Sequence, residues 1–260
     1  MSRTFRVDGI QCTTTGLHLV PAVPSHAYRI QKRPYSPTSA PRRTAGEDPG
    51  AWNRFDTEGS TLYLGQSAEC ALAETLAPLR RAIGSVDPLQ DTADFLGMSL
   101  EEFYEEVADQ WQERNFMGTG SVPRIWRTDR ALHTIALPEE GWWVDIEHPD
   151  SIGAIEKSLT DLLKTQKIAQ LDTSHLRSSN RHLTTAIAQW TRDQVLFDGS
   201  EALGVIFGSR HGEYLNWAGW LRRGDHNQGT DNYRQVQSNR IPFNHAALLR
   251  VANRYGLKIF

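Results

Sequence analysis

The stretch RFDTEGSTLYLGQSAECALAE, residues 54–74, joins a β-prone run to an alanine-rich segment. The alternation over residues 60–65 predicts a strand, and the apolar spacing that begins at Ala68 predicts a helix. Three polar side chains mark the start, the middle and the end of the stretch: Arg54, Tyr63 and Glu74. The stretch therefore predicts a strand, a turn and a helix that could carry three polar groups to one place.

The predicted helix has one apolar face. That face comprises Ala68, Leu72, Leu76, Leu79 and Ile83, whereas Cys70, Glu74 and Arg81 fall on the opposite side. Glutamates on the polar side of a helix are usually solvated. Helical spacing alone therefore makes Glu74 a surface residue, free to face either solvent or a cleft.

Composition is that of an ordinary soluble protein. The chain has 260 residues, of which 39% are hydrophobic and 23% charged, and its formal net charge is −3. Proteins whose main task is to neutralise nucleic-acid phosphates are usually basic, so we expect no direct nucleic-acid partner.

No apolar run approaches the ~18 residues of a membrane span, and the N-terminus lacks the apolar core of a secretory signal. The two cysteines have no CxxC spacing. We therefore expect a cytoplasmic protein with no membrane partner, disulfide framework or cysteine-based zinc site.

Strands and helices are interspersed along the rest of the chain. Further strands are predicted over residues 27–32, 131–137, 142–146, 202–209 and 214–221, and helices over 99–114, 151–166, 180–194 and 244–255. The proline-rich residues 33–50 predict a long surface loop. The nearly continuous apolar run at 202–209 is typical of a strand buried on both faces.

Residues 99–114 predict a helix whose start is capped by Ser99 and Glu102. The sequence LGMSLEEF, residues 96–103, resembles the second helix of a helix-turn-helix. The helix holds six acidic residues against one arginine, however, which argues against a DNA contact. We expect a solvated or partner-facing helix.

Several common catalytic motifs are absent. The sequence contains no GxxxxGK[ST], GxGxxG after a strand, HExxH or GxSxG. His175 and His182 are spaced for one helix face, but no further ligand completes a set with them. We therefore expect no metal.

What the sequence does contain is an ordered set of short elements. Tyr28-Arg29 is followed by Arg54-Phe55, then by Tyr63 in LYLG and Glu74 in ALAE, and much later an apolar strand ends in Gly208-Ser209-Arg210. This order resembles the RES domain family, named for its arginine, glutamate and serine. The resemblance covers residues 27–222, and 54–74 is its most specific part.

The resemblance implies an α+β fold similar to ADP-ribosyltransferases, with a twisted mixed sheet split around an NAD cleft and helices around it. It implies a single domain over residues 1–260 with a core at 27–222, a helical insertion at 86–123 and a C-terminal extension at 224–260. The chain departs from the family at Asn53-Arg54-Phe55-Asp56, where members often have Gly-Arg-Trp-Asn.

The resemblance also implies an activity. RES proteins are known chiefly as toxins that consume NAD by hydrolysis or phosphorolysis, or that transfer its ADP-ribose to a protein. Their usual partner is a small helix-turn-helix antitoxin that occludes the cleft. We therefore expect an NAD-degrading enzyme, the toxin of a toxin–antitoxin pair, with NAD as its substrate. An ADP-ribosyltransferase and a non-catalytic nucleotide-binding or partner-binding module are the alternatives, and a homodimer is left open.

Cleavage of the nicotinamide–ribose bond develops positive charge on the ribose, so an anion is needed there and cations are needed at the phosphates. On the resemblance, Glu74 stabilises the ribose, Arg29 and Arg54 bind the pyrophosphate, and Tyr63 stacks on the nicotinamide ring. Ser209 would hold the nicotinamide amide or the adjacent ribose, and Arg210 would contact a phosphate.

Overall fold

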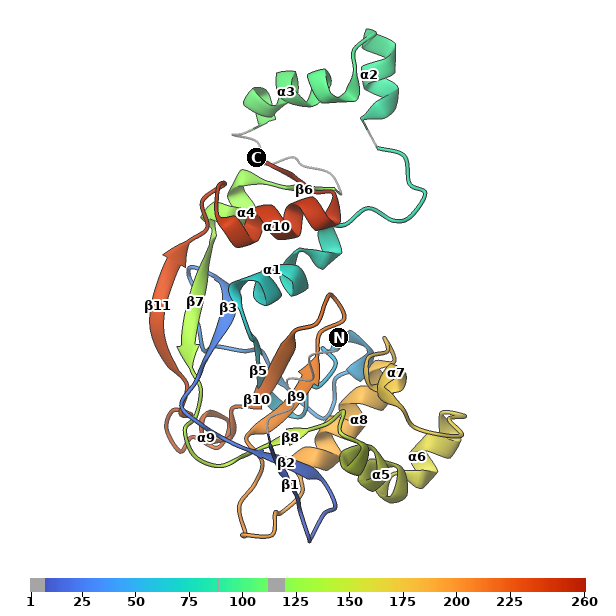
Figure 1. The fold of residues 1–260 in the computed structure, drawn as a ribbon, viewed down its shortest axis with the longest axis vertical. Coiled ribbons are helices and arrows are strands. Elements are labelled where there is room, and N and C mark those ends of the chain that lie inside the picture. Colours follow the sequence, from blue (N-terminus) through green and yellow to red (C-terminus); the bar gives the residue numbers. More distant parts are fainter. Residues whose placement is uncertain (1–7, 88, 112–119) are drawn as a thin grey trace.

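The computed structural model describes residues 8–87, 89–111 and 120–260. A large mixed sheet runs through the molecule in the order β1-β2-β8-β9-β10-β5-β3-β7-β11, with β4 paired to β5 off this path (Figure 1). The strands of this sheet are β1 (Ile10–Gln11), β2 (His18–Pro21), β3 (His26–Lys32), β4 (Arg42–Arg43), β5 (Gly59–Gly65), β7 (Arg130–Ala136), β8 (Trp142–Asp145), β9 (Gly204–Gly208), β10 (Leu215–Trp220) and β11 (Arg234–Arg240). A separate parallel pair joins β6 (Ser121–Val122) to β12 (Lys258–Ile259).

The sheet consists of two halves that meet at one point. β5 pairs with β10 from Thr61 to Gly65, and β3 pairs with β7 along its whole length. Between β3 and β5, by contrast, the described chain pairs only Tyr28 with Gly65. The two halves therefore separate beyond this position, which leaves room between β3 and β5.

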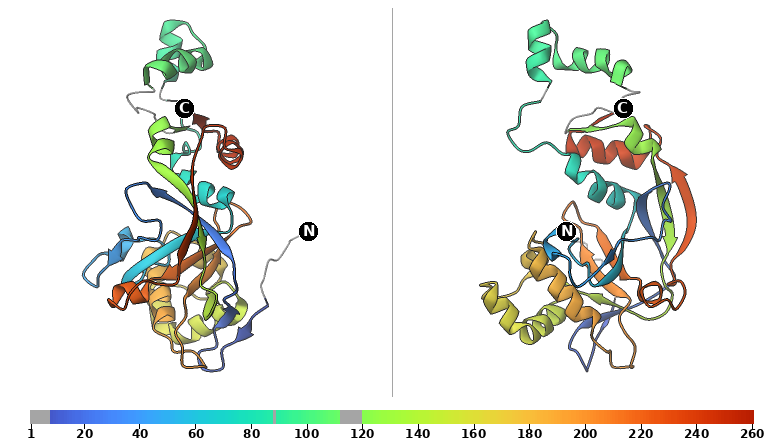
Figure 2. Two further views of the ribbon diagram at one scale, coloured as in Figure 1. Left: turned by 90° about the vertical axis from the view of Figure 1, so that its left-hand side faces the viewer. Right: turned by 180° about the vertical axis from the view of Figure 1, so that it is seen from behind.

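Helices cover the two halves separately. The helices are α1 (Ala68–Leu76), α2 (Gln90–Leu96), α3 (Leu100–Trp111), α4 (Arg124–Thr128), α5 (Pro149–Ser158), α6 (Thr160–Thr165), α7 (Thr173–Leu176), α8 (Arg181–Arg192), α9 (Arg222–Asp225) and α10 (Ala246–Tyr255). α5 to α8 gather beside β8, β9 and β10, whereas α1 and α10 lie together beside β3 and β7 (Figures 1 and 2). α2 and α3 lie beyond α4 and α10, away from the sheet.

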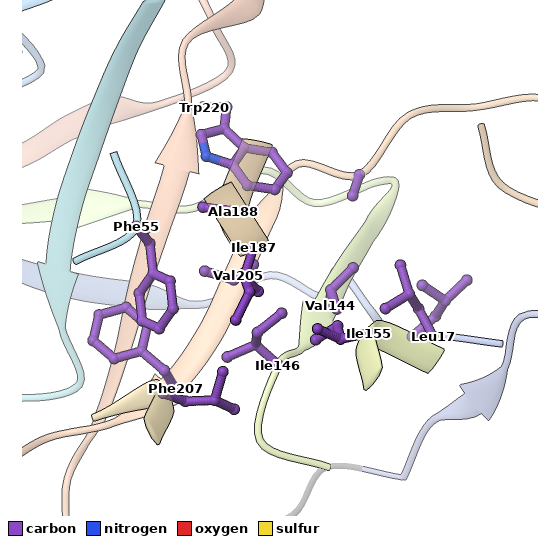
Figure 3. Packing of buried hydrophobic residues seen from close by; sticks show 14 of the residues in the cluster. Leu17, Phe55, Val144, Ile146, Ile155, Ile187, Ala188, Val205, Phe207 and Trp220 are labelled. Atoms are coloured by element: carbon purple, nitrogen blue, oxygen red, sulfur yellow. The ribbon is translucent and has the colours of Figure 1, made fainter. Parts of the chain in front are cut away.

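The largest apolar cluster joins α5 to α8 to the half-sheet of β8, β9 and β10. Phe55, which belongs to the loop before β5, packs its ring 4.7 Å from that of Phe207 on β9 (Figure 3). Ile187 of α8 and Val205 of β9 are both fully buried in the same cluster. The loop that precedes β5 is therefore fixed to the core immediately beside Arg54.

The α+β class and the mixed sheet expected from the sequence are confirmed. All predicted strands form, and β9 is buried at every position. Ser99 and Glu102 form the expected capping box, with Glu102 N–H donating to Ser99 Oγ at 3.2 Å and Ser99 N–H to Glu102 Oε2 at 2.9 Å. The helix that they cap is described to Trp111, and its predicted end at 112–114 lies outside the described residues.

Two predictions about helix boundaries are wrong. α1 ends at Leu76, because Pro78 has no N–H to continue it, and the chain tightens into a 3₁₀ turn at Ala77–Leu79. Ile83 is in consequence fully exposed. Residues 151–166 form two helices that meet at Leu159.

The other two wrong assignments concern residues expected on one face of a helix. Cys70 is fully buried, because α1 packs against β3 and β5 as well as α10, and its Sγ donates to Asn216 Oδ1 of β10 at 3.2 Å. His175 and His182 belong to different helices, α7 and α8.

The division of the chain into a RES-like core, an insertion at 86–123 and an extension from 224 stays a prediction. Within the described ranges, no helix combines the length and apolar character that a membrane crossing requires.

Candidate functional site

A pocket opens where the two half-sheets separate. Its walls come from β3, β5, α1, the ends of β9 and β10, the loop before β5 and the start of α8, and its volume is about 370 Å³. Tyr28 and Gly65, the single pair between β3 and β5, both line it. The split expected from the sequence thus coincides with a pocket of the size that small-molecule sites usually have.

Glu74 extends into this pocket from α1. Its Oε1 accepts a hydrogen bond from Ser209 Oγ at 2.7 Å and another from Asn216 Nδ2 at 3.0 Å. Its Oε2 lies 3.7 Å from Nε2 of His211, and about a third of the side chain is exposed. The carboxylate is therefore held through one oxygen, and the other oxygen faces the rim of the pocket.

The start of α1 explains why Glu74 has this place. Ser67 caps the helix by accepting the N–H of Cys70 at 3.1 Å. The Cβ of any side chain at Gly65 would lie 2.9 Å from Cys70 Sγ, so glycine permits α1 to fold back closely on the end of β5. Glu74 follows one turn after Cys70, on the side of α1 that faces Asn216 and Ser209.

Arg54 presents a buried cation to the same pocket. Its side chain is only 8% exposed, and its Nε and Nη1 find no hydrogen-bond acceptor within the described parts of the chain. The guanidinium lies 5.2 Å from the ring centre of Phe207 and 5.6 Å from that of Phe55. Burial lowers the pKa of Arg54, and the charge of Glu74 opposes this effect. The guanidinium is thus held in place by rings, while the described chain offers no acceptor to its Nε and Nη1.

Two further arginines line the pocket. Arg29 on β3 donates from Nη2 to the carbonyl oxygen of Ser39 at 2.9 Å, and its Nη1 has no acceptor among the residues described. Burial lowers the pKa of Arg29 to about 10. Arg181, the first residue of α8, donates to the carbonyl of Ser178 at 3.1 Å. Three arginines and one glutamate give the lining a net charge of +2, which suits a ligand with two negative charges.

Tyr63 lies in the pocket wall with its hydroxyl already bound. The hydroxyl oxygen accepts the N–H of Phe55 at 2.9 Å, and its ring meets that of Phe207 edge-on at 6.4 Å. Burial raises the pKa of Tyr63 well above its usual range. Tyr63 therefore fixes the loop that carries Arg54, and only its ring is available to a ligand. Stacking on nicotinamide stays a prediction.

Ser209 and Arg210 differ in their placement. Ser209 is buried, donates to Glu74 and accepts the N–H of His211 at 3.0 Å, so its hydroxyl is committed to positioning the glutamate. Arg210 is exposed and does not belong to the pocket lining, although its charge lowers the pKa of Arg54. The structure thus brings Glu74, Arg54, Arg29, Tyr63 and Ser209 together and leaves Arg210 outside the pocket. Contact of either Ser209 or Arg210 with a ligand stays a prediction.

Sequence reasoning missed three residues of the site. Asn216 is a buried polar residue within an otherwise apolar strand, a signal that could have been used. His211 follows Ser209 by two residues, but nothing in the sequence relates it to Glu74. Arg181 gives no sequence signal, since nothing in the sequence relates the start of α8 to the distant residues of the pocket.

One group of possible metal ligands lies away from the pocket. His18, His148 and Asp150 approach one another, with each histidine Nδ1 within 3.6 Å of Asp150 Oδ2. The two imidazole rings are stacked, however, with centres 3.6 Å apart and planes 15° apart. A ligating lone pair lies in the plane of its ring, so this stacking does not suit a shared ion. His148 also caps α5 by accepting the N–H of Asp150. We interpret the group as a histidine stack and a helix cap.

Comparison with known proteins gives a family match that includes four of the expected site residues. Residues 26–139 match the family model of the RES domain. Among solved structures, the chain is similar to one in the crystal structure of the M. tuberculosis MbcT–MbcA toxin–antitoxin complex, with 14% identity over 91% of each chain and a TM-score of 0.38. That similarity is too low to support an argument about fold or function. No curated protein matches the sequence. The resemblance to the RES domain family is therefore confirmed over residues 26–139, the part of the chain that holds Arg29, Arg54, Tyr63 and Glu74.

Proposed function

We propose that this protein degrades NAD by cleaving the bond between nicotinamide and ribose. The observation that carries the proposal is the lining of the pocket, in which a fixed carboxylate stands among three arginines at the split of the sheet. The RES family match over residues 26–139 supports the same substrate class. NAD is then a substrate, and no metal is required.

The charges of the pocket correspond to those of NAD. The pyrophosphate of NAD carries two negative charges and its nicotinamide ring one positive charge, and the lining offers three arginines to the former and one glutamate to the latter. Arg54 and Arg29 each keep a guanidinium nitrogen for which the described chain offers no acceptor, and phosphate oxygens would supply it. Binding of the pyrophosphate would thus satisfy buried donors that the fold itself leaves unpaired.

Glu74 supplies the charge that the reaction needs. As the C–N bond breaks, its electron pair leaves with nicotinamide and positive charge develops on the ribose ring. A carboxylate near the ribose stabilises this charge more than it stabilises the neutral sugar, so it lowers the barrier. The hydrogen bonds from Ser209 and Asn216 hold the carboxylate in place before the substrate arrives.

The biological setting is part of the proposal. RES proteins are known chiefly as toxins, so we propose a toxin whose partner is a helix-turn-helix antitoxin that blocks the pocket. Transfer of ADP-ribose to a protein target and binding of a nucleotide without turnover are the competing functions. Intact-mass analysis of acceptor proteins would reveal transfer, and calorimetry without product formation would reveal simple binding.

Mass spectrometry of the NAD products, with and without phosphate, tests the proposal directly. Hydrolysis yields nicotinamide and ADP-ribose, whereas phosphorolysis yields nicotinamide and ADP-ribose-1″-phosphate. We expect Glu74→Gln to abolish most of the nicotinamide release at unchanged folding. Glu140→Gln, a change at an exposed glutamate in the turn before β8, is the matched control. Absence of nicotinamide release from the unaltered protein under both conditions would overturn the proposal.

A further inference from the structure

His211 lies beside Glu74, on the loop that joins β9 to β10, just outside the residues that line the pocket. Its Nε2 is 3.7 Å from Oε2 of Glu74, the carboxylate oxygen that Ser209 and Asn216 do not hold. Its backbone N–H donates to Ser209 Oγ at 3.0 Å, and its ring meets Tyr255 of α10 edge-on at 6.2 Å. The imidazole is therefore anchored beside the glutamate of the pocket.

The surroundings of His211 favour its neutral form. Burial lowers the pKa of His211, and the charges of Arg210, Arg80 and Arg54 act in the same direction. Glu74 opposes them, and Tyr255 faces the ring without a charge at neutral pH. A neutral imidazole can accept a proton through a ring nitrogen.

A water molecule hydrogen-bonded to both groups would connect His211 to Glu74. Two polar atoms 3.7 Å apart are too far for a direct hydrogen bond, yet a single water can reach both of them. Such a water would lie next to the carboxylate that stabilises the charged ribose. It would thus be close to the carbon atom that must be attacked.

We propose that His211 is the general base that activates water for the hydrolysis of NAD. This inference rests on the proposed function. It specifies how water, rather than phosphate, becomes the group that attacks the ribose. The nicotinamide–ribose bond breaks, and its electron pair leaves with nicotinamide. The water oxygen then forms a bond to the ribose C1″, and one of its protons passes to the neutral imidazole and later to solvent. The products are nicotinamide, ADP-ribose and one released proton.

Phosphate distinguishes this role from a structural one. The phosphate dianion already carries the charge needed for attack, so it requires no base. We expect His211→Gln to lower hydrolysis of NAD about 100-fold, within the usual range for loss of a general base, and to change phosphorolysis less than about threefold. ADP-ribose binding, measured by calorimetry, should be retained. His226→Gln, at an exposed histidine that ends α9, is the matched control and should change neither rate.

The outcomes separate the two hypotheses. No nicotinamide release from the unaltered protein would overturn the proposed function itself. Equal losses of hydrolysis and phosphorolysis in His211→Gln, unchanged hydrolysis, or release that occurs only with phosphate would overturn the role of His211 alone.

A titration of the histidine rings by NMR tests the pairing independently of turnover. The signal of His211 is assigned as the one missing from His211→Gln. Because Glu74 raises the pKa of His211, Glu74→Gln should lower that pKa further. A pKa of His211 that does not respond to Glu74→Gln would show that the two groups do not face each other, and it would refute the proposal.

Discussion

Replacement of Arg54 by methionine should stabilise the fold and abolish ligand binding at the same time. Each buried donor left without a partner costs about 1–3 kcal/mol, and the described chain leaves Nε and Nη1 of Arg54 without an acceptor. The contacts with the rings of Phe55 and Phe207 return about 0.5–1 kcal/mol each. Methionine keeps much of this packing through its sulfur. The free energy of unfolding should therefore rise by about 1–4 kcal/mol, and each kcal/mol corresponds to a Tm increase of roughly 2–4 °C for a chain of this size.

Thermal unfolding with and without ADP-ribose measures both effects. A ligand present at about 100 times its Kd stabilises the unaltered protein by about 2.7 kcal/mol. Arg54→Met should raise the Tm in the absence of ligand and show no further shift with ADP-ribose. The reason is that pyrophosphate would accept hydrogen bonds from Nε and Nη1 of Arg54, and the methionine variant lacks these donors.

Arg192→Met is the matched control, because Arg192 is equally buried but both of its Nη atoms have acceptors. It donates to Asp225 at 3.1 Å and to Thr57 at 2.9 Å. Its loss removes the cationic partner of the buried Asp225 carboxylate, which keeps only the N–H of Ser60 among the contacts described, and this costs about 3–5 kcal/mol. The two arginine variants should therefore shift the Tm in opposite directions. A comparable loss of stability in Arg54→Met, or a persistent shift with ADP-ribose, would refute the reasoning.

Three other changes have defined outcomes. Glu74→Gln should lower kcat for nicotinamide release about 100-fold to 1,000-fold while ADP-ribose binding persists, because a fixed group aimed at developing charge is removed; stopped assays and calorimetry check this. Ser209→Ala should lower kcat at least about tenfold at nearly constant KM, since it removes a hydrogen bond to a charged group. Glu69 binds Tyr214 and two arginines of α10, which lower its pKa to about 2 from a model-compound value of 4.5. A lowered pKa in the folded state stabilises above the unfolded value, so this contribution should be lost as the pH falls from about 4.5 to 2. Acid unfolding curves of Glu69→Gln should lack that contribution.

The stretch 54–74 could be predicted because its structure is locally determined. Alternation specifies β5, the cap at Ser67 specifies the start of α1, and both form as expected. The end of α1 was misjudged because helical spacing of leucines was followed past Pro78, whose missing N–H ends the helix. Ile83 therefore lies beyond the end of α1 and takes no part in its apolar face.

Other parts of the fold depend on contacts that sequence patterns do not carry. β11 was missed because the sequence RQVQSNR is exposed at every position, so no buried face imposes an apolar alternation. This strand forms by adding to the edge of β7. The same limit applies to the site, where His211 and Arg181 approach Glu74 and Arg54 only through tertiary structure. The ordered motif identified the residues of β3, β5 and α1, which lie close together in the fold.

The position of the site follows from the point at which the half-sheets part. Tyr28 is the last residue of β3 that pairs with β5, and Arg29 is the next residue along the strand. The backbone beyond Tyr28 has no β5 partner on that side among the described residues, and the pocket opens there. Gly65, the partner of Tyr28, lets α1 turn back over this opening, so that Glu74 enters from above while Arg29 enters from the strand. A sheet paired continuously across β3 and β5 would have closed the pocket. The split therefore provides the space of the pocket. Arg29, which follows Tyr28, and Glu74, on the helix that follows Gly65, provide charged groups in it.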